Sequence, residues 1–143
     1  MKKVLILMAT YNGAKYLDEQ IQSLIEQKNV QVDILVRDDG STDNTIEVLN
    51  KWKEQNKLEW YKGKHLNVQF GFYDLMERAR TRDVDYLAFC DQDDVWDLDK
   101  LCIAVEKLEK LCNKSMPALY YCGQRLVDEN MKFIADHKLN KYR

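Results

Sequence analysis

The sequence contains few of the residues that break or crosslink a polypeptide. It has one proline, five glycines and four cysteines in 143 residues, and it shows no internal repeat or flexible linker. No two cysteines form a C-x-x-C pair, which argues against a zinc ribbon or a redox dithiol. The length suits one domain with a proper core. We therefore expect residues 1–143 to form a single domain whose thiols are reduced and mostly buried.

Long hydrophobic runs and an excess of positive charge are also missing. The apolar run at residues 4–9 has the length of a strand, and no segment is long enough to span a bilayer. The net charge is -2, which argues against non-specific binding to nucleic acid. These features predict a soluble cytoplasmic protein without a nucleic-acid partner.

Hydrophobic periodicity predicts strands that alternate with helices. Continuous apolar runs are typical of strands covered on both faces, and apolar positions at three- and four-residue intervals are typical of amphipathic helices. The alternation predicts a three-layer α/β/α fold with a mostly parallel, Rossmann-like sheet. Strands are expected at residues 4–9, 30–36, 58–61, 84–89, 118–122 and 126–134, the last with a hairpin turn at 128–130. Helices are expected at residues 14–27, after 41–43, after a loop at 67–71 and at 98–111.

Polar clusters follow three of the predicted strands, at residues 10–13, 38–43 and 91–94. In a parallel sheet, ligands bind outside the carboxyl ends of the strands, so these clusters are expected to meet at one edge. The cluster at 91–94 has three carboxylates in four residues, and such an oxygen-rich set suits Mg or Mn. The alternative is an acidic loop that caps a helix beginning near Leu98.

Glycine-based phosphate sites are not found in the sequence. The first strand is not followed by G-x-G-x-x-G, and there is no P-loop because His65 follows Gly63 and Lys64. A calcium loop starting at residue 91 fails because Val95 stands where an oxygen ligand is required. A carboxylate site remains, in which a metal ion would neutralise phosphates.

Taken in order, the segments at residues 9–12, 36–43, 67–71, 91–96 and 99–101 resemble those of family 2 glycosyltransferases. They are particularly similar to the rhamnosyltransferase-like branch, over almost the whole chain. The resemblance implies the GT-A fold and an inverting, metal-dependent enzyme of bacterial surface-polysaccharide assembly. Such an enzyme takes its sugar from a UDP- or dTDP-type nucleotide diphosphate donor and passes it to a glycan or lipid-linked acceptor.

The resemblance implies separate roles for the polar residues. Thr10 and Tyr11 would line the nucleoside pocket, and Asp39 would accept a hydrogen bond from the imide N–H of uracil or thymine. Asp91 would face the ribose or the donor sugar. Asp93 would hold a Mg or Mn ion that bridges the diphosphate.

Other residues of these segments have supporting roles in the same interpretation. Asn67 and Gly71 would contact the donor, with a wider spacing than the family pattern. Asp38 and Ser41 are interpreted either as supports of their loop or as turn and helix-cap residues. Asp94 is expected to support the site or to act as a cap.

The catalytic base is not assigned within this sequence. The resemblance places it in an acidic pair beyond Arg143, so we expect a truncated, donor-binding part of a longer protein. Membrane association at the inner face would depend on the missing regions. Asp128 and Glu129 are expected to form a turn instead. A nucleotide-sugar-binding module without transfer activity is the main alternative; a nucleotidyltransferase or a receiver-like signalling domain agrees less well with the motifs.

Overall fold

The structure is a computed structural model that describes residues 1–64, 68–111 and 116–137. The chain divides into two compact units, Met1–Ile103 and Ala104–Arg143, and each is described by itself. Among the described residues, no helix is both long and apolar enough to cross a membrane.

A parallel sheet forms the centre of the first unit. Within the described part of this unit its strands lie in the order β3-β2-β1-β4, and every neighbouring pair is parallel. Thr10 pairs with Asp38, and Asp38 pairs with Lys62, so the strands end level with one another. The loops that follow them therefore start at one edge. The strands are β1 (Lys2–Thr10), β2 (Val30–Asp38), β3 (Glu59–Lys62) and β4 (Tyr86–Cys90).

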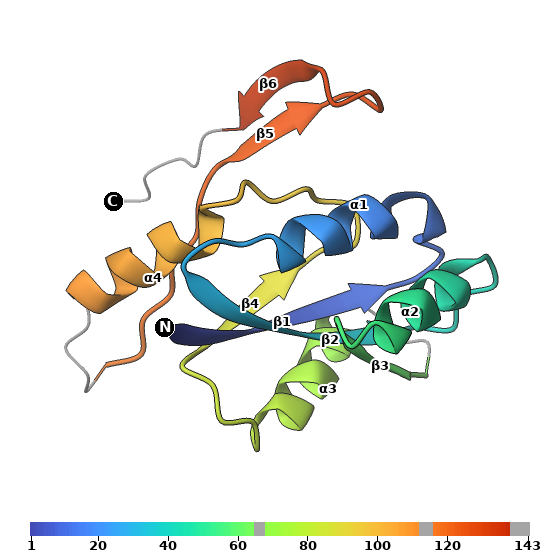
Figure 1. Cartoon of the computed structure of the whole chain (residues 1–143), viewed down its shortest axis with the longest axis horizontal. Coiled ribbons are helices and arrows are strands. Elements are labelled where there is room, and N and C mark those ends of the chain that lie inside the picture. Colours follow the sequence, from blue (N-terminus) through green and yellow to red (C-terminus); the bar gives the residue numbers. More distant parts are fainter. Residues whose placement is uncertain (65–67, 112–115, 138–143) are drawn as a thin grey trace. The chain divides into compact units, whose positions relative to one another are not determined.

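Helices cover both faces of this sheet, as Figure 1 shows. Helices α1 (Ala14–Ile25) and α2 (Thr45–Glu54) lie on one face, and α3 (Val68–Ala79) lies on the other. The predicted three-layer α/β/α arrangement is confirmed. Helix α4 (Lys100–Leu111) begins in the first unit and continues into the second.

The core explains why β1 is apolar without interruption from Val4 to Ala9. Successive side chains of a strand point to opposite faces, and both faces of β1 are covered. Leu5 and Leu7 pack with Leu35 and Leu75 on the side of α3, and all four side chains are at most 5% exposed. Ile6 is fully buried as well, so the alternate positions are also covered.

The hairpin expected near the end of the chain is confirmed. Strands β5 (Gln124–Val127) and β6 (Phe133–His137) pair antiparallel in the second unit. Asp128 stabilises the connection between them, because its Oδ1 accepts hydrogen bonds from the backbone N–H groups of Asn130 and Lys132. It is therefore a turn residue, as predicted.

Three expectations about local structure are wrong. Residues 118–122 do not form a strand, because no described strand pairs with them, and their apolar side chains, such as Leu119, remain exposed. Helix α3 already begins at Val68, so Gly71 lies in a helix and not in a loop. The thiols are not mostly buried: of the described cysteines only Cys90 is buried, whereas Cys102 and Cys122 are half-exposed.

Candidate functional site

Gln92 joins the loop after β1 to the segment after β4. Its Oε1 accepts hydrogen bonds from the Thr10 hydroxyl, at 2.7 Å, and from the Tyr11 backbone N–H, at 2.9 Å. Its Nε2 donates to the Tyr11 carbonyl at 3.3 Å. A Cβ at Gly13 would collide with the Gln92 side chain, so the two segments approach each other closely. Two of the three predicted polar clusters therefore meet through one side chain.

A second set of hydrogen bonds joins the loop after β1 to the loop after β2. The Asn12 backbone N–H donates to the Ser41 hydroxyl oxygen at 2.9 Å, and the Asn12 Oδ1 accepts from the Thr42 backbone N–H at 2.8 Å. Asn12 has a φ of 50°, in the left-handed region that asparagine tolerates better than most residues. The Gly13 N–H donates to the Thr45 hydroxyl oxygen at 2.9 Å, at the start of α2. All three predicted clusters are thus brought together.

Asp38 holds the loop after β2 in shape. Its buried carboxylate accepts hydrogen bonds from the backbone N–H groups of Gly40 and Ser41 and from the Ser41 hydroxyl. Gly40 has a φ of +93°, a conformation that L side chains rarely adopt. These contacts agree both with Asp38 as a support of its loop and with Asp38 as a turn residue. Asp43 lies just before α2, and its Oδ1 accepts the backbone N–H of Thr45, the first residue of that helix.

Helix α1 and Gln27, two residues beyond its end, fix the segment that follows the acidic cluster. The Ser23 hydroxyl oxygen accepts the Trp96 backbone N–H at 3.0 Å. Gln27 donates to the Asp97 carbonyl at 2.8 Å and accepts the Leu101 backbone N–H at 3.0 Å. The side chains of Ser23 and Gln27 are buried, so these hydrogen bonds are largely shielded from water.

The acidic cluster lies at the sheet edge and not at a helix start. Helix α4 begins at Lys100 and not near Leu98, so residues 95–99 separate the cluster from the helix and the interpretation of the cluster as a helix cap is wrong. Asp91 and Asp93 are exposed, whereas Asp94 is half-buried. Burial raises the pKa of Asp94, and the neighbouring charges of Asp91 and Asp93 raise it further, against the opposing effect of Lys100.

The donor set of this cluster fits a hard divalent cation with incomplete protein coordination. Carboxylate oxygens are the ligands that Mg²⁺ and Mn²⁺ prefer, and a cation would relieve the repulsion that Asp94 experiences. Among the described residues, no three His, Cys, Asp or Glu side chains are arranged to hold an ion by themselves. An ion here would therefore need phosphate oxygens or water to complete its shell, which is common for Mg²⁺.

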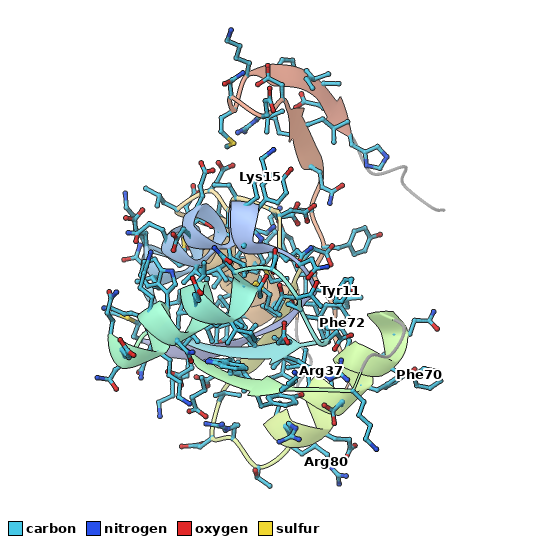
Figure 2. All side chains as sticks on the ribbon, turned by 90° about the vertical axis from the view of Figure 1, so that its right-hand side faces the viewer. Tyr11, Lys15, Arg37, Phe70, Phe72 and Arg80 are labelled. Atoms are coloured by element: carbon cyan, nitrogen blue, oxygen red, sulfur yellow. The ribbon has the colours of Figure 1, made fainter. Side chains whose placement is uncertain are left out.

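The predicted nucleoside residues differ in accessibility. Tyr11 is 45% exposed, whereas Thr10 is buried beneath it with its hydroxyl directed to Gln92. Asp39 is 7% exposed and forms an ion pair with Arg37. Figure 2 looks onto this edge of the first unit and labels Tyr11 and Arg37. The predicted donor contact Asn67 lies outside the described residues.

Several residues of the site were not singled out in the sequence. Gln92 stood inside the acidic cluster without a role. Gln20 and Ser23 on α1, and Gln27 two residues after its end, recur at intervals of three and four and are buried, and buried polar side chains are a signal of specific hydrogen bonds. Gln20 donates to the Cys90 sulfur at 2.6 Å, at the end of β4.

Comparisons with known proteins agree with this arrangement. The model of Glycosyl transferase family 2 matches residues 5–135, so the chain belongs to that family. It is 36% identical over 137 residues to the dTDP-rhamnosyl transferase RfbG of Shigella flexneri, covering 85% of this chain and 45% of that protein. It is 28% identical over 112 residues to the putative teichuronic acid biosynthesis glycosyltransferase TuaG of Bacillus subtilis, covering 76% and 43%. The chain thus spans less than half the length of these two relatives.

Solved structures share the fold at lower sequence identity. S. aureus TarS 1-349 in complex with UDP is 20% identical with a TM-score of 0.61, over 92% of this chain and 43% of that one. The mannosyltransferase PcManGT of Pyrobaculum calidifontis, in complex with GDP-Man and Mn²⁺, is 24% identical with a TM-score of 0.61, over 75% and 32%. The likeness shows the fold, which is the GT-A arrangement expected from the motifs.

Proposed function

We propose that this chain is the donor-binding part of an inverting, metal-dependent glycosyltransferase. Its donor is a UDP- or dTDP-type sugar, and its acceptor is a glycan or lipid-linked glycan of bacterial surface-polysaccharide assembly. The observation that carries the proposal is the joining of three polar loops by Gln92 and Asn12 at the carboxyl edge of the sheet. The names of relatives support it, since one is a dTDP-rhamnosyl transferase and another a putative teichuronic acid glycosyltransferase.

In this proposal the nucleoside occupies the side of the edge near Tyr11 and Asp39. The exposed ring of Tyr11 stacks on the base. The Asp39 carboxylate accepts the imide N–H of uracil or thymine, because an ionised carboxylate is an acceptor only. Thr10 contributes by holding Gln92, and Gly71 by letting α3 approach Asp39, whose Oδ2 would be 3.7 Å from a Cβ at that position.

The diphosphate and sugar occupy the side near the acidic cluster. Asp93 holds the divalent cation, and Asp91 faces the ribose or the donor sugar. When bound, the cation neutralises charge that develops on the departing nucleotide. We assign no general base to this chain. The same proposal includes a cytoplasmic location at the inner face of the membrane. It also groups both units in one nucleotide-sugar-binding domain, which the family match over residues 5–135 supports.

Calorimetry tests this function directly. UDP and dTDP are titrated into the chain in Mn²⁺, in Mg²⁺ and with the metal chelated. We expect binding that needs the metal, and we expect Asp93→Asn to weaken it about tenfold or more, as for loss of a charged ligand. Asp99→Asn, a change of an exposed carboxylate in the same segment, is the matched control and should bind as the parent does. Absence of metal-dependent binding to any nucleoside diphosphate would refute the proposal.

A further inference from the structure

A buried guanidinium lies directly behind the proposed base-binding carboxylate. Arg37, near the end of β2, has a side chain that is 1% exposed. It forms an ion pair with Asp39, its Nε lies 3.1 Å from the Asp74 carboxylate of α3, and its Nη2 donates to the Lys64 carbonyl at 2.7 Å. Burying a charge without partners is costly, and Arg37 has partners on three sides.

The backbone around Arg37 is shaped to this side chain. A Cβ at Gly63 would collide with the guanidinium, and a Cβ at Gly71 would lie 3.2 Å from Nη1. Glycine at these two positions lets the end of β3 and the first turns of α3 close on Arg37. The guanidinium therefore has little freedom to change its direction.

The far side of Arg37 is fixed by a second set of contacts. The Tyr61 hydroxyl donates to the Asp74 carboxylate at 2.6 Å, and Arg78 lies 3.7 Å from the same carboxylate. The Tyr61 hydrogen bond and the charges of Arg78 and Arg37 lower the pKa of Asp74, against the opposing effect of burial. An ionised Asp74 holds one edge of the guanidinium, which leaves the other edge to Asp39.

We propose that Arg37 is a positioning residue that orients the Asp39 carboxylate and thereby selects pyrimidine bases that carry an imide N–H. The proposal rests on the proposed function, in which Asp39 receives the base. The ion pair is made through the Asp39 Oδ1, so it constrains the direction of the whole carboxylate. Uracil and thymine present a hydrogen-bond donor at N3, which the Asp39 carboxylate can accept. Cytosine presents an acceptor at N3, whose lone pair would face a lone pair of the same carboxylate.

A scaffold role alone makes a different prediction. If Arg37 only supported the fold, its loss would weaken binding of all nucleotides to the same degree. If Arg37 directs Asp39, loss of Arg37 weakens binding of the uracil nucleotide more than binding of the cytosine nucleotide. The reason is that a misdirected or neutral Asp39 no longer discriminates between the two bases. The ratio of the two affinities separates these cases, whereas the affinity for UDP alone does not.

The experiment compares UDP with CDP, each titrated with Mn²⁺ into the parent, Arg37→Met, Arg37→Lys and Asp74→Asn. We expect the parent to prefer UDP, and we expect the ratio of its UDP and CDP affinities to fall about tenfold in Arg37→Met, as for loss of a contact between charged groups. Arg37→Lys keeps the charge but not the planar fork, so it should show an intermediate preference. Asp74→Asn, which touches Arg37 and not Asp39, should keep most of the preference.

The outcomes are distinct from failure of the proposed function. A parent that binds neither UDP nor dTDP refutes the function, and the inference with it. A parent that prefers UDP, with the same preference in Arg37→Met, overturns the inference alone. If circular dichroism shows Arg37→Met to be unfolded, Arg37→Lys decides: a reduced preference supports the positioning role, and an unchanged one overturns it.

Discussion

The hydrogen bond between Thr10 and Gln92 can be tested by a double-mutant cycle. Gln92→Ala removes the 2.7 Å bond from the Thr10 hydroxyl and two exposed bonds with the Tyr11 backbone. At about 1 kcal/mol for the part-buried bond and about half that for each exposed one, the variant should lose roughly 2 kcal/mol of unfolding free energy. Thr10→Val removes only the first bond and should lose about 1 kcal/mol.

The double variant should be no less stable than Gln92→Ala, because the shared bond is already lost. The expected coupling is therefore about 1 kcal/mol between the two positions. Urea unfolding followed by tryptophan fluorescence measures it, since Trp52 and Trp96 are both buried in the first unit. A double variant whose loss equals the sum of the single losses, about 3 kcal/mol, would refute the link between these loops.

Three further predictions concern the surroundings of the site. Gly71→Ala should not give the stabilisation of about 1 kcal/mol that is usual in a helix, because the new Cβ would lie 3.2 Å from Arg37. A higher unfolding free energy of the variant, measured with urea, would contradict this. Burial raises the pKa of Cys90 to about 12, so iodoacetamide at pH 8 should modify Cys102 but not Cys90 until the protein is unfolded, as read by mass spectrometry. The Lys51 hydrogen bond lowers the pKa of Asp18, so the contribution of Asp18 to the free energy of unfolding is present above about pH 4 and is lost at lower pH. Asp18→Asn should therefore reduce the fall of the unfolding free energy between about pH 5 and 3. An equal fall in the parent and the variant would count against this.

The meeting of the three polar clusters was predictable because it follows from topology. Parallel strands end at the same edge, so the position of Asp91 near the loop after β1 needed only the strand assignments. The strand ends themselves were short by one or two residues: β1 extends to Thr10, and β2 extends to Asp38. Thr10 and Asp38 still pair with each other between the two strands. A strand assignment based on runs of apolar residues stops before such polar positions.

The hydrogen bonds within the site were not predictable from the sequence. Gln92 bonds to residues more than 80 positions away, and nothing in its local sequence distinguishes it from a surface glutamine. Arg37 precedes two aspartates, and this sequence predicts a charged residue at the end of a strand. Only the fold shows that Arg37 is buried and that it contacts Asp74 of α3. The apolar run at 118–122 was misassigned because strand formation depends on a pairing partner that local sequence does not specify.

The contacts from α1 to the segment after β4 have a consequence for local opening. The amides of Trp96 and Leu101 are bonded to Ser23 and Gln27, and the Trp96 amide lies in a stretch without regular secondary structure. Hydrogen exchange of both amides should therefore be slow, and that of Trp96 should follow the opening of α1, which carries Ser23. A motion that carried Trp96 away from α1 would break its bond to Ser23, so opening of this segment and loss of that helix contact would occur together.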